Sequence, residues 1–141
     1  MNTQKMIERE EGRKLRAYSD TLGIWTIGVG HTGPGICANT VWTDAKVDDQ
    51  YRIDEAIATA GCKSNFAWFG ALNDERQAVL VGMAFQMGVD GLLAFTRTLA
   101  AVRDGRFADA QAGMLASKWA KQTPLRAERM ARQMLTGVWS T

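Results

Sequence analysis

The stretch EEGRKLRAYSDTLGIWTIGVGHTG, residues 10–33, predicts two short strands joined by a tight turn. The strands are expected at Leu15–Tyr18 and Ile24–Val29, where apolar and aromatic residues gather. Ser19–Gly23, between them, has the residue types of a turn. In the second strand Thr26 and the neighbouring glycines share one face, and we expect this face to leave room for a ligand near the backbone.

Two acidic residues stand on either side of the first predicted strand. Glu11 is expected in the last turn of a first helix whose N-cap is Thr3 and which ends at Gly12. The negative end of the helix dipole disfavours a carboxylate there and raises its pKa, which suits a general acid. Asp20 lies in the turn. Hydrolysis of a glycosidic bond needs such a pair, an acid for the leaving oxygen and a base for the attacking water.

The remainder of the chain predicts helices. One helix is expected from its N-cap Thr43 to about Ala60, with Gly61 as its end. Beyond residue 65 the apolar periodicity is helical to the end of the chain. N-cap residues and glycines there predict a helix from Asn73 to Gly88 and a last helix from Thr123-Pro124 to Gly137.

The composition is that of a globular protein with its own core. Of 141 residues, 46% are hydrophobic and 23% are charged, so we expect one domain. The net charge of +2 is too small to indicate a nucleic-acid partner, and no apolar run has the length of a membrane span. Residues 97–133 carry eight basic and three acidic side chains. This excess predicts either a solvated helix face or attraction to an anionic surface.

The cysteines and the histidine do not form a metal-binding pattern. Cys37 and Cys62 are the only cysteines and His31 is the only histidine, so the sequence predicts no metal site. Free thiols are the first interpretation. A Cys37–Cys62 disulfide stays open as an alternative outside the cytoplasm.

Three blocks, spread over nearly the whole chain, carry a resemblance to a known family. They are EGRKLRAYSDTLGIWTIGVGH (11–31), FQMGVDGLLAFTRTL (85–99) and KWAKQTPLRAERMARQMLTGVW (118–139). In content and order they resemble the T-even bacteriophage-type lysozymes of glycoside hydrolase family 24. The resemblance implies an α+β, lysozyme-like fold with the active-site cleft between two lobes. Its expected parts are a β-hairpin lobe (about 13–42), a connecting helix (about 43–60) and a helical lobe (1–11 and 65–141).

The resemblance also implies an activity. The family's enzymes are endolysin-type muramidases, which hydrolyse the β-1,4 bond between N-acetylmuramic acid and N-acetylglucosamine in bacterial peptidoglycan. Glu11 matches the family's general acid, and Asp20 and Thr26 match the residues that position the attacking water. The family is described as inverting, which implies carboxyl groups roughly 6.5–9.5 Å apart. The resemblance implies no cofactor, and the expected partner is the bacterial cell wall.

Further positions match with roles that support catalysis. Arg126 matches an arginine that pairs with Glu11 across the cleft. Such a pairing opposes the rise in the Glu11 pKa, so the net direction of the shift stays open. His31 matches a histidine in a structural ion pair, and Asp54 is the expected partner here. Sugar contacts are implied for Thr32, Phe85 and Thr98. Gln86, next to Phe85, is also expected to reach the cleft. Gly113 stands where the family carries a side chain that can bind the saccharide.

The chain departs from the T-even pattern in length. The stretch between His31 and Phe85 is shorter, which predicts a shallower cleft or a more mobile lip.

The N-terminus lacks the apolar core of a secretory signal peptide. We therefore expect a monomer in the host cytoplasm that does not insert into the membrane and acts on the cell wall after release.

Two other functions compete with hydrolysis. A lytic transglycosylase cuts the same bond without water, so it needs the acid but no carboxylate to position water; the presence of Asp20 and Thr26 weighs against it. A non-catalytic cell-wall binding module needs none of the three residues. Release of reducing sugar ends indicates hydrolysis, release of anhydro ends indicates a transglycosylase, and release of neither indicates a binding module.

Overall fold

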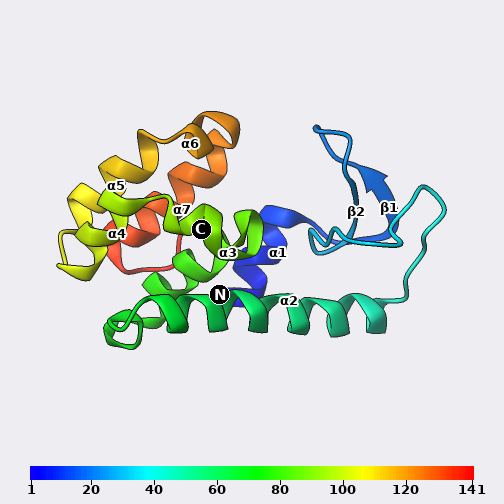
Figure 1. Ribbon diagram of the computed structural model, residues 1–141, viewed down its shortest axis with the longest axis horizontal. Helices are drawn as coiled ribbons and strands as arrows, with labels where there is room; N and C mark the ends of the chain where they lie inside the picture. Colours follow the sequence, from blue (N-terminus) through cyan, green and yellow to red (C-terminus); the bar gives the residue numbers. More distant parts are fainter.

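A hairpin and a set of helices make up the chain, as the sequence predicts. The computed structural model describes residues 1–141. Figure 1 shows the hairpin on one side, most of the helices on the other, and α2 running along both. This arrangement confirms the α+β fold. In chain order the elements are α1 (Thr3–Glu11), β1 (Lys14–Ser19), β2 (Trp25–Gly28), α2 (Asp44–Asn65), the 3-10 helix η1 (Phe69–Ala71), α3 (Asp74–Leu93), α4 (Thr96–Arg103), α5 (Phe107–Leu115), α6 (Lys118–Gln122) and α7 (Pro124–Thr136).

The two strands pair antiparallel, with Tyr18 opposite Thr26. The prediction that this face of β2 leaves room for a ligand is wrong at Gly28, where a Cβ would contact the Trp42 ring and Val47. Thr26 is only 5% exposed. The small residues therefore let the start of α2 pack closely against the hairpin.

Two helix boundaries differ from the prediction. The N-cap of α1 is Asn2, whose side chain accepts a hydrogen bond from the Lys5 N–H, and not Thr3. Thr43 caps α2 as expected, but this helix continues past Gly61 to Asn65. A Cβ at Gly61 would lie 3.0 Å from a methyl carbon of Val89, so this glycine permits close packing of α2 on α3 and does not end the helix.

The later helices follow their predicted signals in most places. Asn73 caps α3, and Gly88 interrupts this helix with φ 76° and ψ 159° before it resumes to Leu93. Gly137 ends α7 in the left-handed conformation. Thr123 is not a side-chain cap of α7, since its hydroxyl donates to the Trp119 carbonyl. The short helix α6, which the sequence analysis missed, lies just before it.

The core lies around α3 in the helical part of the molecule. Residues Ala78–Ala84 of α3 are buried on all sides, and methionines from several helices pack with them: Met6, Met83, Met114, Met130 and Met134. Flexible thioether side chains suit such an irregular contact between helices. No single helix has both the length and the apolarity for a membrane crossing; α3 and α4 reach them only as a pair bent by 105°.

Arg76 holds the end of α7 in place. Its guanidinium donates to the carbonyls of Met134 and Leu135, at 2.8 and 2.9 Å, and lies 3.5 Å from the centre of the Phe107 ring. A cation at the C-terminal end of a helix is favoured by the helix dipole. This contact joins α3, α5 and α7. Helix α7 also carries Arg126, which reaches the candidate site.

The cysteines are free thiols and do not form a disulfide. Cys37 is exposed in the loop after the hairpin, and Cys62 is fully buried in α2. Burial raises the pKa of Cys62 to about 11, which makes this thiol unreactive at neutral pH.

The close packing at Gly61 predicts a coupling between two substitutions. Alanine is favoured over glycine inside a helix by about 1 kcal/mol. In the natural chain Gly61→Ala should not yield this gain, because the new Cβ would crowd Val89. In a Val89→Ala background the gain should appear. Urea unfolding of the four proteins measures it, and equal effects of Gly61→Ala in both backgrounds would contradict the packing role of this glycine.

Candidate active site

Glu11 is the last residue of α1, as predicted, and its side chain meets Arg126 of α7. The Arg126 Nη1 atom donates to the Glu11 Oε1 atom at 2.8 Å. The Glu11 side chain is 16% exposed and that of Arg126 is 12% exposed. The carboxyl is therefore largely removed from water but keeps access to the surface.

The surroundings of Glu11 raise the pKa of its carboxyl above the ordinary value of 4.5. Burial is the largest cause, and the charge of Glu10 acts in the same direction. The charge and the hydrogen bond of Arg126 oppose the rise without cancelling it. A carboxyl of this kind keeps its proton to higher pH, which is what a general acid requires.

Gly30 lies directly against the Glu11 carboxyl. Its backbone has φ 62°, and a Cβ built on it would overlap the Oε2 atom of Glu11. Glycine is thus required here twice, for the backbone conformation and for the space. The loop after β2 closes over the carboxyl through this contact, which the sequence analysis did not assign.

Asp20 organises the turn between the strands. Its Oδ1 atom accepts hydrogen bonds from the backbone N–H groups of Leu22 and Ile24, both at 2.8 Å. The second carboxylate oxygen, Oδ2, accepts no hydrogen bond from the protein. The turn therefore fixes the orientation of the carboxylate through one oxygen and leaves the other available to a ligand or a water molecule.

Thr26 and Tyr18 face each other across the hairpin. The Thr26 hydroxyl donates to the Ile24 carbonyl at 3.1 Å, which leaves its oxygen free to accept. Directly opposite residues of antiparallel strands point to the same side of the sheet, so Tyr18 shares this face. Burial, followed by the charges of Glu11 and Asp20, raises the pKa of Tyr18. Its phenol therefore lies within the field of both carboxylates.

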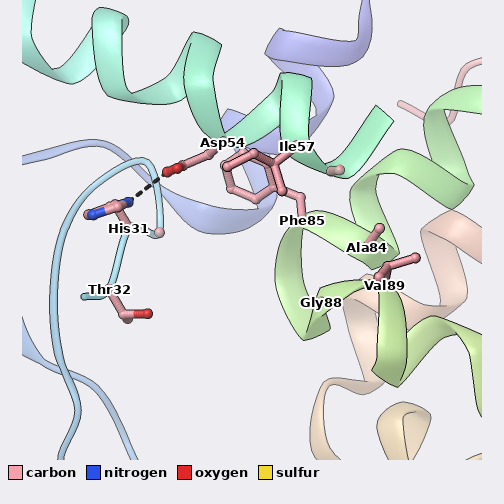
Figure 2. Close-up of a pocket in the computed structure, with 10 residues that line it drawn as sticks. His31, Thr32, Asp54, Ile57, Ala84, Phe85, Gly88 and Val89 are labelled. Atoms are coloured by element: carbon pink, nitrogen blue, oxygen red, sulfur yellow. Dashed lines mark hydrogen bonds and ion pairs between the residues drawn. The ribbon is translucent and has the colours of Figure 1, made fainter. Parts of the chain in front are cut away.

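A cavity of about 250 Å³ opens beside Gly30. Figure 2 shows Thr32 and His31 on one side of it and Phe85 with Ile57 on the other. The structure thus brings two of the predicted sugar-contacting residues, Thr32 and Phe85, to one cavity.

His31 pairs with the expected residue. Its Nδ1 atom lies 2.7 Å from the Oδ2 atom of Asp54, and Gln50 donates to the other carboxylate oxygen at 3.0 Å. Both members of the pair line the cavity. The contact joins the loop after β2 to α2 and so holds the hairpin against the connecting helix.

Three other predicted binding residues lie away from this cavity. Thr98 in α4 is 6% exposed and packs against Gly113 in α5, where a Cβ would overlap the Thr98 hydroxyl. The two line a separate cavity between these helices. The Gln86 side chain accepts a hydrogen bond from the Trp119 indole at 2.9 Å, so its oxygen ties α3 to α6.

Comparisons with known proteins identify the family of this chain. The sequence model of the family described as Phage lysozyme matches residues 8–134, a range that contains Glu11, Asp20, Thr26 and Arg126. This chain belongs to the phage lysozyme family.

Curated relatives fall into two groups by length. Probable T4-type lysozyme 1 of Dictyostelium discoideum is 28% identical over 94% of this chain and 92% of its own length. The pre-baseplate central spike protein Gp5 of Enterobacteria phage T4 is 32% identical over 97% of this chain, which covers 28% of that protein. The peptidoglycan hydrolase gp36 of Pseudomonas phage phiKMV is 30% identical over 94% of this chain and 15% of its own length.

Sequence reasoning missed several residues of this lysozyme's candidate site. Tyr18 was placed in a strand but not in the site, although the hairpin register would have placed it beside Thr26. Glu10 and Arg129 gave no signal, because their contact joins residues 119 positions apart. No group of three His, Cys, Asp or Glu side chains is placed to hold a metal ion.

The contact at Gly30 predicts a loss of activity in Gly30→Ala. The new Cβ would displace the Glu11 carboxyl from Arg126, so peptidoglycan-clearing activity should fall at least about tenfold, as expected when a catalytic group is misplaced. Gly105→Ala is the matched control, because Gly105 has a similar φ of 73° and open space around it. Both variants should lose about 1 kcal/mol of stability from backbone strain. Equal activities in turbidity assays would contradict the role of Gly30.

The raised pKa of Glu11 predicts a pH-dependent stability difference between the natural chain and Glu11→Gln. Protonated Glu11 stabilises the fold fully below pH 4.5, and this stabilisation is lost as pH rises through the folded pKa. The natural chain should therefore lose stability relative to Glu11→Gln over this range. Thermal melts from pH 4 upward measure the difference. A difference that stays constant, or that also appears with the exposed-site variant Glu128→Gln, would contradict it.

Proposed function

We propose that this lysozyme hydrolyses the β-1,4 bond between N-acetylmuramic acid and N-acetylglucosamine in bacterial peptidoglycan. The observation that carries the proposal is the Glu11 carboxyl, which is largely buried against Arg126, has a raised pKa and lies against Gly30, a residue that lines a cavity. Membership of the phage lysozyme family supports it, as do relatives described as lysozymes and as a peptidoglycan hydrolase.

Glu11 acts as the general acid in this proposal. Its proton passes to the glycosidic oxygen as the bond to the sugar breaks, and the carboxylate that forms is stabilised by Arg126 at 2.8 Å. Gly30 keeps the carboxyl in position without occupying the space in front of it.

Asp20 and Thr26 act on the attacking water. The free Oδ2 atom of Asp20 accepts a proton from the water, while the Thr26 hydroxyl oxygen accepts a second hydrogen bond from it. Water attacks the face of the sugar opposite the leaving oxygen, so the β-bond yields an α-anomer, the inverting outcome. Thr32 and Phe85 contact the saccharide from the cavity, and Thr98 and Gly113 lie at an outer position of the binding surface.

A lytic transglycosylase remains the second candidate, since it would use the same acid. The fixed carboxylate of Asp20 favours hydrolysis, because two backbone N–H groups hold it ready beside Thr26. We further propose that the protein acts as a monomer on the cell wall after release from the host cytoplasm.

The test is clearing of purified peptidoglycan by the natural chain, Glu11→Gln and Asp20→Asn. Clearing with new reducing ends is expected from the natural chain. The Glu11→Gln variant should be slower by about 10²–10⁴-fold, the usual contribution of a general acid. The exposed-site variant Glu128→Gln is the control and should retain full activity.

Three results would overturn the proposal in different ways. Anhydro ends, with activity retained in Asp20→Asn, would establish a transglycosylase. Binding to peptidoglycan without any release of ends would establish a wall-binding module. An initial β-anomer, measured by proton NMR of early products, would replace the inverting mechanism with a retaining one.

A further inference from the structure

Glu10, next to the proposed acid, is a buried carboxylate surrounded by arginines. Its side chain is 5% exposed. Arg129 of α7 binds it with two hydrogen bonds of 2.7 and 2.8 Å, one to each oxygen, and Arg9 adds a third at 3.1 Å. Two parallel hydrogen bonds between a guanidinium and a carboxylate fix both groups in orientation.

Arg126 is shared between Glu10 and Glu11. Its Nη2 atom donates to the backbone carbonyl of Glu10 at 2.5 Å, and its Nε atom lies 3.7 Å from the Glu10 Oε2 atom. Its Nη1 atom donates to Glu11 at 2.8 Å. The guanidinium therefore makes one hydrogen bond to the acid and is held by two contacts to its neighbour.

The space beneath these charges is small and partly apolar. A cavity of only about 10 Å³ lies there, lined on its apolar side by Met6, Met130 and Gly82. This volume is at the lower limit for one water molecule. Charge interactions are screened less in such surroundings than in water, and the charge of Glu10 raises the pKa of Glu11.

Few other charged groups face Glu11. Arg126 faces it from α7, Glu10 from α1 and the neutral phenol of Tyr18 from β1. The loop after β2 places Gly30 against the Glu11 carboxyl, and α3 contributes Gly82 to the small cavity; neither glycine carries a charge. Apart from burial, the charges that act on the protonation of Glu11 are therefore those of Arg126 and Glu10.

We propose that Glu10 is a positioning residue for the general acid: its carboxylate, fixed by Arg129 and lying 3.7 Å from the Arg126 Nε atom, offsets part of the Arg126 charge, and Glu11 thereby keeps its proton at the pH of the reaction. This inference rests on the proposed role of Glu11. Glu10 touches neither the substrate nor the water and acts only through Arg126.

Substitutions on the two sides of the Glu10–Arg129 pair should have opposite effects on the acid. Glu10→Gln removes the negative charge that offsets Arg126, so the Glu11 pKa should fall. Arg129→Gln removes a positive charge and leaves Glu10 free to attract Arg126, so the Glu11 pKa should rise. Both substitutions break the same ion pair, and a purely structural role of Glu10 would make both variants change in the same way.

The experiment measures kcat/KM on solubilised peptidoglycan against pH for the three proteins. The basic limb of this profile reports the pKa of the general acid in the free enzyme. It should move to lower pH in Glu10→Gln and to higher pH in Arg129→Gln. At the pH where the natural chain keeps half its maximal rate, the first variant should keep less than half and the second more. Limbs that stay in place, or that move in the same direction, would overturn the proposal.

Two additions keep the test independent of folding and of the proposed activity. Glu10→Asp retains the charge, so the basic limb of its pH profile should lie at the pH found for the natural chain. A basic limb at the lower pH of Glu10→Gln would overturn the proposal. Carbon NMR titration of the Glu11 carboxyl in each folded protein measures the same shifts without substrate. Shifts of the predicted signs in a protein that releases no sugar ends would leave the coupling established and would refute only the proposed function.

Discussion

Arg126 connects the two ends of the chain at the point where catalysis is proposed. It donates to the side chain of Glu11 and to the backbone of Glu10, 115 and 116 positions earlier in the sequence. The last turn of α1 has carbonyls without helical partners, and the helix dipole there is unfavourable for a carboxylate. A guanidinium at this place donates to a free carbonyl and compensates the charge of the carboxylate. The placement of α7 thus decides both the end of α1 and the environment of the acid.

Most of the other contacts serve to hold that placement. Arg76 binds the carbonyls at the far end of α7, and the methionine-rich core fills the space between α1, α3 and α7. On the opposite side, the His31–Asp54 contact and the close packing at Gly28 hold the hairpin on α2. The hairpin that carries Asp20 and Thr26 is thereby a separate but anchored element, and the loop after it places Gly30 against the Glu11 carboxyl.

Local signals in the sequence were sufficient where a residue's effect depends on its own neighbours. Thr43 and Asn73 cap helices because their side chains reach N–H groups three residues ahead. Asp20 forms its turn through N–H groups two and four residues ahead. Gly61 misled the prediction for the opposite reason. Its small size serves a contact with Val89, which is distant in the sequence, and nothing in the local pattern distinguishes this role from a helix end.

The sequence by itself determined the fold class, the family, the hairpin with its turn and the elements in which Glu11, Asp20 and Thr26 lie. All of these depend on short-range patterns and on motifs that can be matched residue by residue. Only the tertiary structure decided the direction of the Glu11 pKa shift, the covered face of β2, the separation of Thr98 from Thr32 and the cluster around Glu10. Burial and the charges of distant residues cause that pKa shift, and both exist only once α1, α7 and the hairpin have packed together.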